Sequence, residues 1–115
     1  MRYVGHLYGL YPSNEGVAWK VDSTLDAIED ITNAFVRAKW EADAEKKATL
    51  TADLMSKTFP TWLGIIDKRI ANNSNHSFVA GDSLTIADLA LVALFNSTAY
   101  NDANEHHGAL RSLVE

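Results

Sequence analysis

The sequence contains no cysteine. A disulfide framework, a thiolate zinc site and a cysteine nucleophile are therefore excluded. Basic residues are also scarce, because 10 Lys and Arg stand against 15 Asp and Glu, for a formal net charge of -5. Neutralising phosphates requires clustered Lys and Arg, so this balance argues against binding to nucleic acid or to an anionic membrane surface.

Long hydrophobic runs are missing as well. Each apolar stretch is interrupted within a few residues, and Met1–His6 has no apolar signal core. We therefore expect a cytoplasmic protein without a membrane span. The chain has 115 residues, of which 47% are hydrophobic, so a single domain with one modest core is expected.

Apolar residues recur at steps of three and four along most of the chain, the period of one helical face. No stretch shows the alternation of a β-strand. The pattern predicts an all-α fold, an antiparallel helical bundle. We expect a long first helix over 15–40, a charged loop or helix end over 41–47, a second helix over 50–70 that Pro60 bends or splits, a polar linker over 72–77, a buried helix over 84–95 and a last helix from Ala109 to Val114.

The segment before the buried helix carries a helix-capping pattern. Thr85 can cap the helix by accepting from the amide of Asp88, and the Asp88 carboxylate can accept from the amide of Thr85. These two residues therefore predict a capping box, with Asp in place of the commoner Glu or Gln. Their role is in folding, not in catalysis.

Four carboxylates lie on one stripe of the first long helix, at Asp22, Asp26, Glu29 and Asp30. Such a stripe is self-repulsive by about a few tenths of a kcal/mol per neighbouring pair, a cost that a solvated surface tolerates. It is either a plain acidic face or a site for a cation such as an ammonium group.

The histidines do not predict a metal site. His6, His76, His106 and His107 form no His-x-x-x-His step, and adjacent histidines on a helix point about 100° apart. No Ser or Tyr lies in a recognisable nucleophile motif. No catalytic residue is therefore predicted within this chain.

Several segments resemble the C-terminal domain of cytosolic glutathione transferases. The capping segment, 78–82 followed by 84–88, is similar to that family's. The opening, 2–4 followed by 9–11, looks like the end of the N-terminal domain and the linker in the alpha, mu, pi and sigma classes. The acidic residues Asp22, Asp26, Glu29 and Asp30 resemble those of the first helix of the C-terminal domain in the same classes. The resemblance covers nearly all of 1–115, with a weak preference for the sigma class.

This resemblance implies a helical domain without its thioredoxin-like half, truncated at both ends, in which 1–12 is the end of the N-terminal domain and the linker. Glutathione would be the co-substrate and a hydrophobic electrophile the second substrate. The domain would supply the hydrophobic pocket and part of a homodimer interface, and alone it would be inactive.

The resemblance also implies roles for individual residues. Asp30, supported by Glu29, matches the position that reaches across the dimer toward the γ-glutamyl amine of glutathione. Residues along the end of the first helix match the pocket for the hydrophobic substrate, although a charged residue is unusual there. These residues are Ala34, Arg37, Ala38 and Trp40.

Two other functions stay open. The chain could be a non-catalytic interaction module, with its acidic stripe docking a basic partner helix. It could also belong to a sigma-type prostaglandin isomerase, which only substrate assays would separate from a transferase.

Overall fold

The computed structural model describes residues 1–115 and contains only helices, turns and loops. The predicted all-helical class is confirmed. No helix is both long and apolar enough to cross a bilayer. The elements are α1 (Arg2–Leu7), α2 (Glu15–Lys39), α3 (Ala44–Asp53), a π-helical turn η1 (Leu54–Thr58), α4 (Phe59–Ala71), α5 (Ile86–Ser97) and α6 (His107–Val114).

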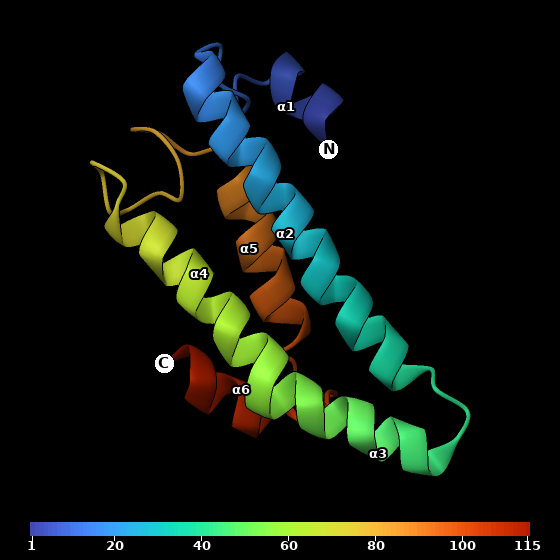
Figure 1. Ribbon diagram of the computed structural model, residues 1–115. Helices are drawn as coiled ribbons and strands as arrows, with labels where there is room; N and C mark the ends of the chain where they lie inside the picture. The colour runs from blue at the N-terminus through green and yellow to red at the C-terminus, as the bar shows by residue number, and fades with distance from the viewer.

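Successive long helices run in opposite directions. The ribbon descends along α2, turns into α3 and climbs along α4, after which α5 descends again between them (Figure 1). The short helix α1 lies beside the start of α2, and α6 ends the chain near the lower part of α4. This arrangement is the antiparallel bundle that the helical periodicity predicts.

Helix α2 begins where the sequence predicts. The Asn14 side chain caps it by accepting from the amide of Val17 at 3.1 Å. Its inner face buries Val21, Thr24 and Ile31, which recur at helical spacing. The predicted first helix is confirmed.

The prediction of a charged loop or helix end over 41–47 is only partly right. Asp43 accepts from the amide of Lys46 at 2.9 Å, so α3 already begins at Ala44. A side-chain cap and good helix formers such as Glu and Lys suffice to begin a helix there without apolar periodicity.

The second predicted helix is interrupted just before Pro60. Proline lacks an amide hydrogen, and its ring would collide with the carbonyl four residues earlier. The chain widens into the π-helical turn η1, in which the amide of Phe59 donates to the carbonyl of Leu54, and Pro60 falls in the first turn of α4. The predicted split at this proline is therefore observed.

The core is an aromatic cluster between α2, α4 and α5. Phe59 is fully buried, packs edge-on against Phe35 and stacks on Trp62, which meets Phe95 edge-on. The indole nitrogen of Trp62 also donates to the carbonyl of Ala27 at 2.8 Å, which fixes α4 against α2.

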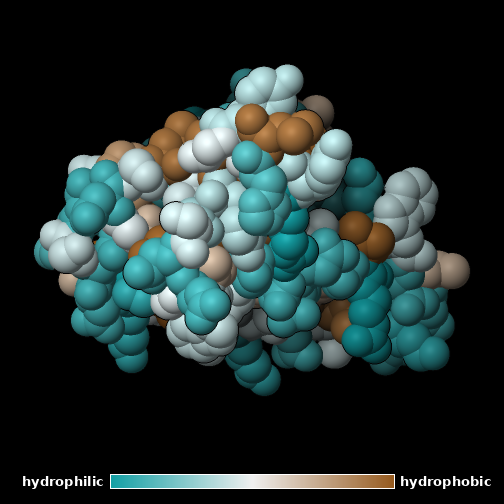
Figure 2. Space-filling model, turned by 90° about the horizontal axis from the view of Figure 1, so that it is seen from above, coloured by the Kyte–Doolittle hydropathy of each residue, from teal (hydrophilic) through white to brown (hydrophobic).

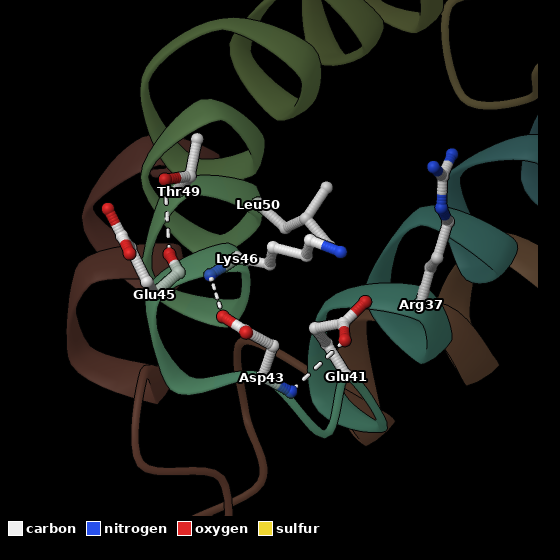
Figure 3. Close-up of a pocket in the computed structure, with 7 residues that line it drawn as sticks. All are labelled: Arg37, Glu41, Asp43, Glu45, Lys46, Thr49 and Leu50. Atoms are coloured by element: carbon white, nitrogen blue, oxygen red, sulfur yellow. Dashed lines mark hydrogen bonds between the residues drawn. The ribbon is translucent and has the colours of Figure 1, made fainter.

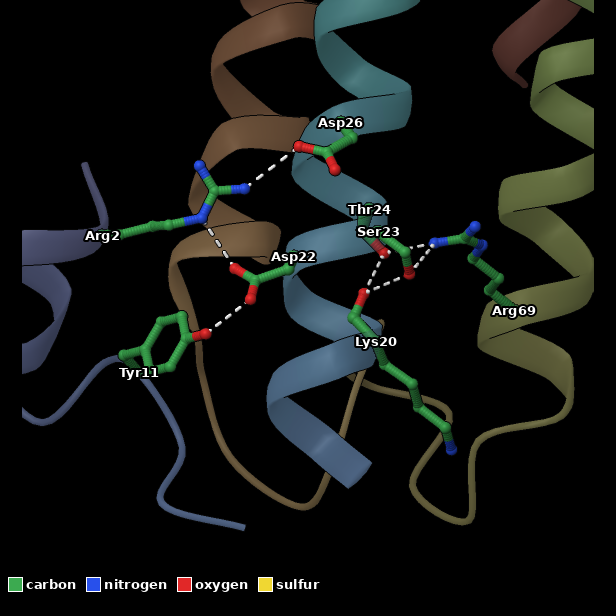
Figure 4. Close-up of polar contacts among 8 residues, drawn as sticks. All are labelled: Arg2, Tyr11, Lys20, Asp22, Ser23, Thr24, Asp26 and Arg69. Carbon is green, nitrogen blue, oxygen red and sulfur yellow. Dashed lines mark hydrogen bonds and ion pairs between the residues drawn. The ribbon is translucent and has the colours of Figure 1, made fainter. Parts of the chain in front are cut away.

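A second polar bridge joins α4 to α2 near the other end of the pair. One guanidinium nitrogen of Arg69 donates to the hydroxyl oxygens of Ser23 at 3.0 Å and Thr24 at 2.9 Å (Figure 4). One indole and one guanidinium thus add hydrogen bonds to the antiparallel packing of these two helices.

The predicted capping box at the start of α5 is present. Asp88 accepts from the amide of Thr85 at 2.9 Å, and its other oxygen accepts from the amide of Val79 at 2.8 Å. The same carboxylate therefore begins the helix and holds the preceding loop. Gly81 lies in that loop with a φ of 67°, a backbone conformation that disfavours side chains.

Asn73 also organises this loop. It is buried, and its amide nitrogen contacts the carbonyls of Asn75, Phe78 and Gly81 at 2.8 to 2.9 Å. The predicted polar linker over 72–77 therefore contains a structural residue.

Residues 1–12 pack against α5 as well as α2. The amide of Ile86 donates to the carbonyl of Leu10 at 3.0 Å, and a side chain at Gly5 would lie 2.7 Å from Ile86. Much of the α1 surface remains apolar and exposed, as does one side of α5. Seen from above, the molecule is mostly hydrophilic with separate hydrophobic patches (Figure 2).

We predict that Asp88→Ala lowers the free energy of unfolding by about 2 to 3 kcal/mol, because three donors lose a charged acceptor. Urea denaturation followed by circular dichroism measures this change. Asp67→Ala, which removes an exposed carboxylate without a hydrogen bond, should change stability by less than about 0.5 kcal/mol. Equal losses in both variants would contradict the proposed role of Asp88.

Candidate functional site

The acidic stripe on α2 is divided by contacts from residues 1–12. The Arg2 guanidinium donates to Asp22 at 2.7 Å and to Asp26 at 3.1 Å, and the Tyr11 hydroxyl donates to the second oxygen of Asp22 at 2.7 Å (Figure 4). The four carboxylates therefore do not form one free cation site. Half of the stripe instead anchors the N-terminal segment.

These contacts stabilise the charged form of Asp22. The Tyr11 hydroxyl, followed by the Arg2 guanidinium, lowers the pKa of Asp22. In turn, the hydrogen bond to Asp22 raises the pKa of Tyr11. The phenol thus remains a donor, and the carboxylate an acceptor, throughout the neutral range.

Glu29 and Asp30 form the remaining part of the stripe, and both are exposed. Glu29 accepts from the Asn33 side chain at 3.5 Å, whereas Asp30 has no side-chain hydrogen bond. At 100° per residue, Asp30 lies about 200° around the helix from Ile28. It therefore faces away from the side of α2 that carries Ile28.

That opposite side of α2 forms one wall of the main cavity, which has a volume of about 950 Å³. Helices α3 and α5, the turn η1 and the segment after α5 form the other walls. The lining is largely apolar and includes Ile28, Phe35, Val36, Leu54, Met55, Ala90, Ala93 and Leu94. Its polar groups include Thr32, Thr51, Ser97 and Thr98 and the charged residues Lys39, Lys47 and Glu105. A concave, mostly apolar space of this size fits a drug-sized ligand.

The residues predicted to line the substrate pocket do not converge on one cavity. Ala38 is buried and lines the main cavity, and Ala34 packs against the hydrophobic core. Trp40 lies at the end of α2 with 75% of its surface exposed. Arg37 faces a different, open hollow of about 610 Å³.

This open hollow between the end of α2 and the start of α3 is polar. Arg37, Glu41, Asp43, Glu45 and Lys46 surround it (Figure 3). Two of the acidic side chains there accept hydrogen bonds from backbone amides. Glu41 accepts from the amide of Asp43, and Asp43 caps α3 by accepting from the amide of Lys46. Opposite charges and an open shape make it a poor site for one specific ligand.

Sequence reasoning missed several cavity residues. Thr32 follows Ile28 by four residues and precedes Phe35 by three, so the helical period could have placed it on this face. The lining residues of α3 and α5 could not be found this way, because they depend on how the helices pack. No group of three or more His, Asp or Glu side chains is arranged to hold a metal ion.

Comparison with known proteins adds an independent finding. Residues 29–115 match the family model described as the glutathione S-transferase, C-terminal domain. The chain is 28% identical over 95 residues to Glutathione S-transferase 2 of Manduca sexta, an alignment that covers 83% of this chain and 46% of that protein. The chain thus spans about half the length of the curated relative that it matches.

We predict that Asp22→Asn lowers the melting temperature by a few degrees at pH 7, because Arg2 and Tyr11 lose their charged partner. Since the folded pKa of Asp22 is lowered, its contribution is present above the ordinary pKa of about 3.9 and is lost as pH falls through the folded value. The difference between the two proteins should therefore shrink below about pH 4.

Thermal denaturation at a series of pH values measures this effect. Asp26→Asn is the matched control on the same helix, because Asp26 is more exposed and has only the 3.1 Å contact with Arg2. A pH-independent difference for Asp22→Asn would contradict the prediction.

Proposed function

This chain belongs to the glutathione S-transferase C-terminal domain family, and from that premise we propose that it forms the helical half of a transferase that conjugates glutathione to hydrophobic electrophiles. The main cavity carries this proposal, because a largely apolar space of about 950 Å³ suits such an electrophile. Glutathione would be held mainly by a thioredoxin-like domain outside this chain, and the chain alone would have little activity.

Within this proposal Asp30 binds glutathione in trans. Its carboxylate is exposed, has no ion-pair partner and faces away from the chain's own cavity. A carboxylate there can accept a charge-assisted hydrogen bond from the γ-glutamyl ammonium of glutathione on a second subunit, with Glu29 beside it. The active form would then be a cytoplasmic homodimer, and the sigma class is our preferred assignment.

The proposed electrophile site differs in part from the residues expected from the resemblance. Ala38 lies in the cavity wall, and Trp40 lies at the helix end next to the cavity residue Lys39. Ala34 and Arg37 would act indirectly, through core packing and through the polar hollow. Residues 1–12 would be the linker and the end of the preceding domain.

The interaction-module alternative has less support. Docking of a basic helix would need the whole acidic stripe, yet Arg2 and Tyr11 already engage Asp22, and Arg2 engages Asp26. A sigma-type isomerase would use the same cavity, so the choice between conjugation and isomerisation depends on substrate assays.

We predict that glutathione binds only to a longer form that carries the preceding thioredoxin-like domain. In that form Asp30→Ala should weaken binding by about 1.5 to 3 kcal/mol, as expected for a hydrogen bond to a charged group. Isothermal titration calorimetry measures both affinities. Asp67→Ala is the control, because it removes an exposed carboxylate on α4. Failure of the longer form to bind glutathione would favour the interaction module.

We further predict that Ala93→Trp raises the KM for an aryl halide electrophile by roughly tenfold in the longer form, because the indole fills part of the cavity. The KM for glutathione should stay unchanged. Val92→Trp is the matched control, since Val92 neighbours Ala93 on α5 but is exposed and does not line the cavity. Similar effects of the two substitutions on the electrophile would contradict this placement of the pocket.

A further inference from the structure

The charged residues around the turn between α2 and α3 line two different spaces. The polar hollow is surrounded by Glu41, Asp43 and Glu45 together with the cations Arg37 and Lys46 (Figure 3). Lys39 and Lys47, by contrast, line the main cavity. The cavity of an acidic protein thus has two cations at one end.

Neither of these lysines is neutralised within the chain. The ion pairs of the structure join Arg2, Lys57, Arg111 and two histidines to carboxylates, and they include neither Lys39 nor Lys47. Lys47 is only partly exposed, which makes the lack of a partner more costly than it would be for a fully solvated lysine.

The Lys39 ammonium is positioned by an aromatic ring and not by a carboxylate. It lies 5.7 Å from the centre of the Trp40 ring, so the aromatic face holds the cation by its quadrupole. Trp40 is itself exposed and does not line the cavity, but its ring contacts a residue that does.

The single carboxylate in the cavity lining belongs to a different wall. Glu105 lies in the segment after α5, and one of its oxygens is 3.5 Å from His106. The amides of Asn101 and Asn104 in the same segment already donate to the carbonyls of Ser97 and Thr98. The two lysines therefore remain the free charged donors of the cavity.

We propose that the main cavity prefers an elongated apolar ligand with a carboxylate at one end, which Lys39 and Lys47 bind while the hydrocarbon part occupies the space between α2 and α5. This inference rests on the proposed function, because it names the substrate class of the same pocket: an electrophile derived from a carboxylic acid. Lysine ammonium groups favour a carboxylate through charge-assisted hydrogen bonds, and the apolar wall selects the chain.

The test compares two fluorescent probes that differ only in charge, 11-(dansylamino)undecanoic acid and its methyl ester, titrated into this chain without glutathione. We expect the acid to bind roughly tenfold more tightly than the ester at low salt. This preference should decline in high salt, because screening weakens the attraction of the lysines for the carboxylate.

In the double variant Lys39→Gln/Lys47→Gln, the acid and the ester should bind with equal affinity, and the affinity of the ester should match that of the unmodified chain. Lys46→Gln is the matched control, because Lys46 precedes Lys47 on α3 but lines the polar hollow. It should keep the preference for the acid. Circular dichroism melting of each variant verifies that the fold is intact.

Equal binding of the two probes by the unmodified chain would overturn the inference, as would failure of both to bind. Persistence of the acid preference in the double variant, or its loss in Lys46→Gln, would do the same. None of these outcomes depends on glutathione, so failure of the glutathione titration and failure of the carboxylate preference remain distinguishable.

Discussion

The packing of the helices depends on the hydrogen bonds that the Asp88 carboxylate accepts. One oxygen begins α5 at Thr85, and the other fixes the loop at Val79. The position of α5 then decides two other contacts, because the amide of Ile86 binds the carbonyl of Leu10 and residues of α5 form a wall of the main cavity. A single capping residue thus connects the N-terminal segment, the core helix and the proposed electrophile site.

Features that depend on local chemistry could be predicted from the sequence. The helices follow from apolar spacing, the start of α5 from Thr85 and Asp88, and the interruption near Pro60 from the missing amide hydrogen. The same reasoning predicts a charged loop or helix end over 41–47, whereas α3 begins at Ala44. The side-chain cap at Asp43 begins this helix without any apolar periodicity. Local rules therefore recovered the elements and erred mainly at one boundary.

Contacts between distant residues could not be predicted in this way. The acidic stripe looked uniform in the sequence, yet Arg2, 20 residues before Asp22, divides it into an engaged half and an exposed half. The cavity likewise depends on the packing of α2 against α5. Of the pocket residues predicted on α2, only Ala38 lies in the lining of this cavity. Periodicity identifies a helical face, but the partner that covers the face is a property of the whole fold.

The two faces of α2 have a consequence for the proposed function. Asp30 lies on the side of α2 opposite the cavity wall, so the proposed glutathione contact and the proposed electrophile site are on different faces of one helix. In the proposed arrangement, the glutathione near Asp30 would belong to another subunit, whereas the electrophile would occupy the chain's own cavity. Helix α2 would then contribute to two active sites at once. Under this proposal, dimerisation would bring the glutathione of a second subunit to the exposed carboxylate of Asp30.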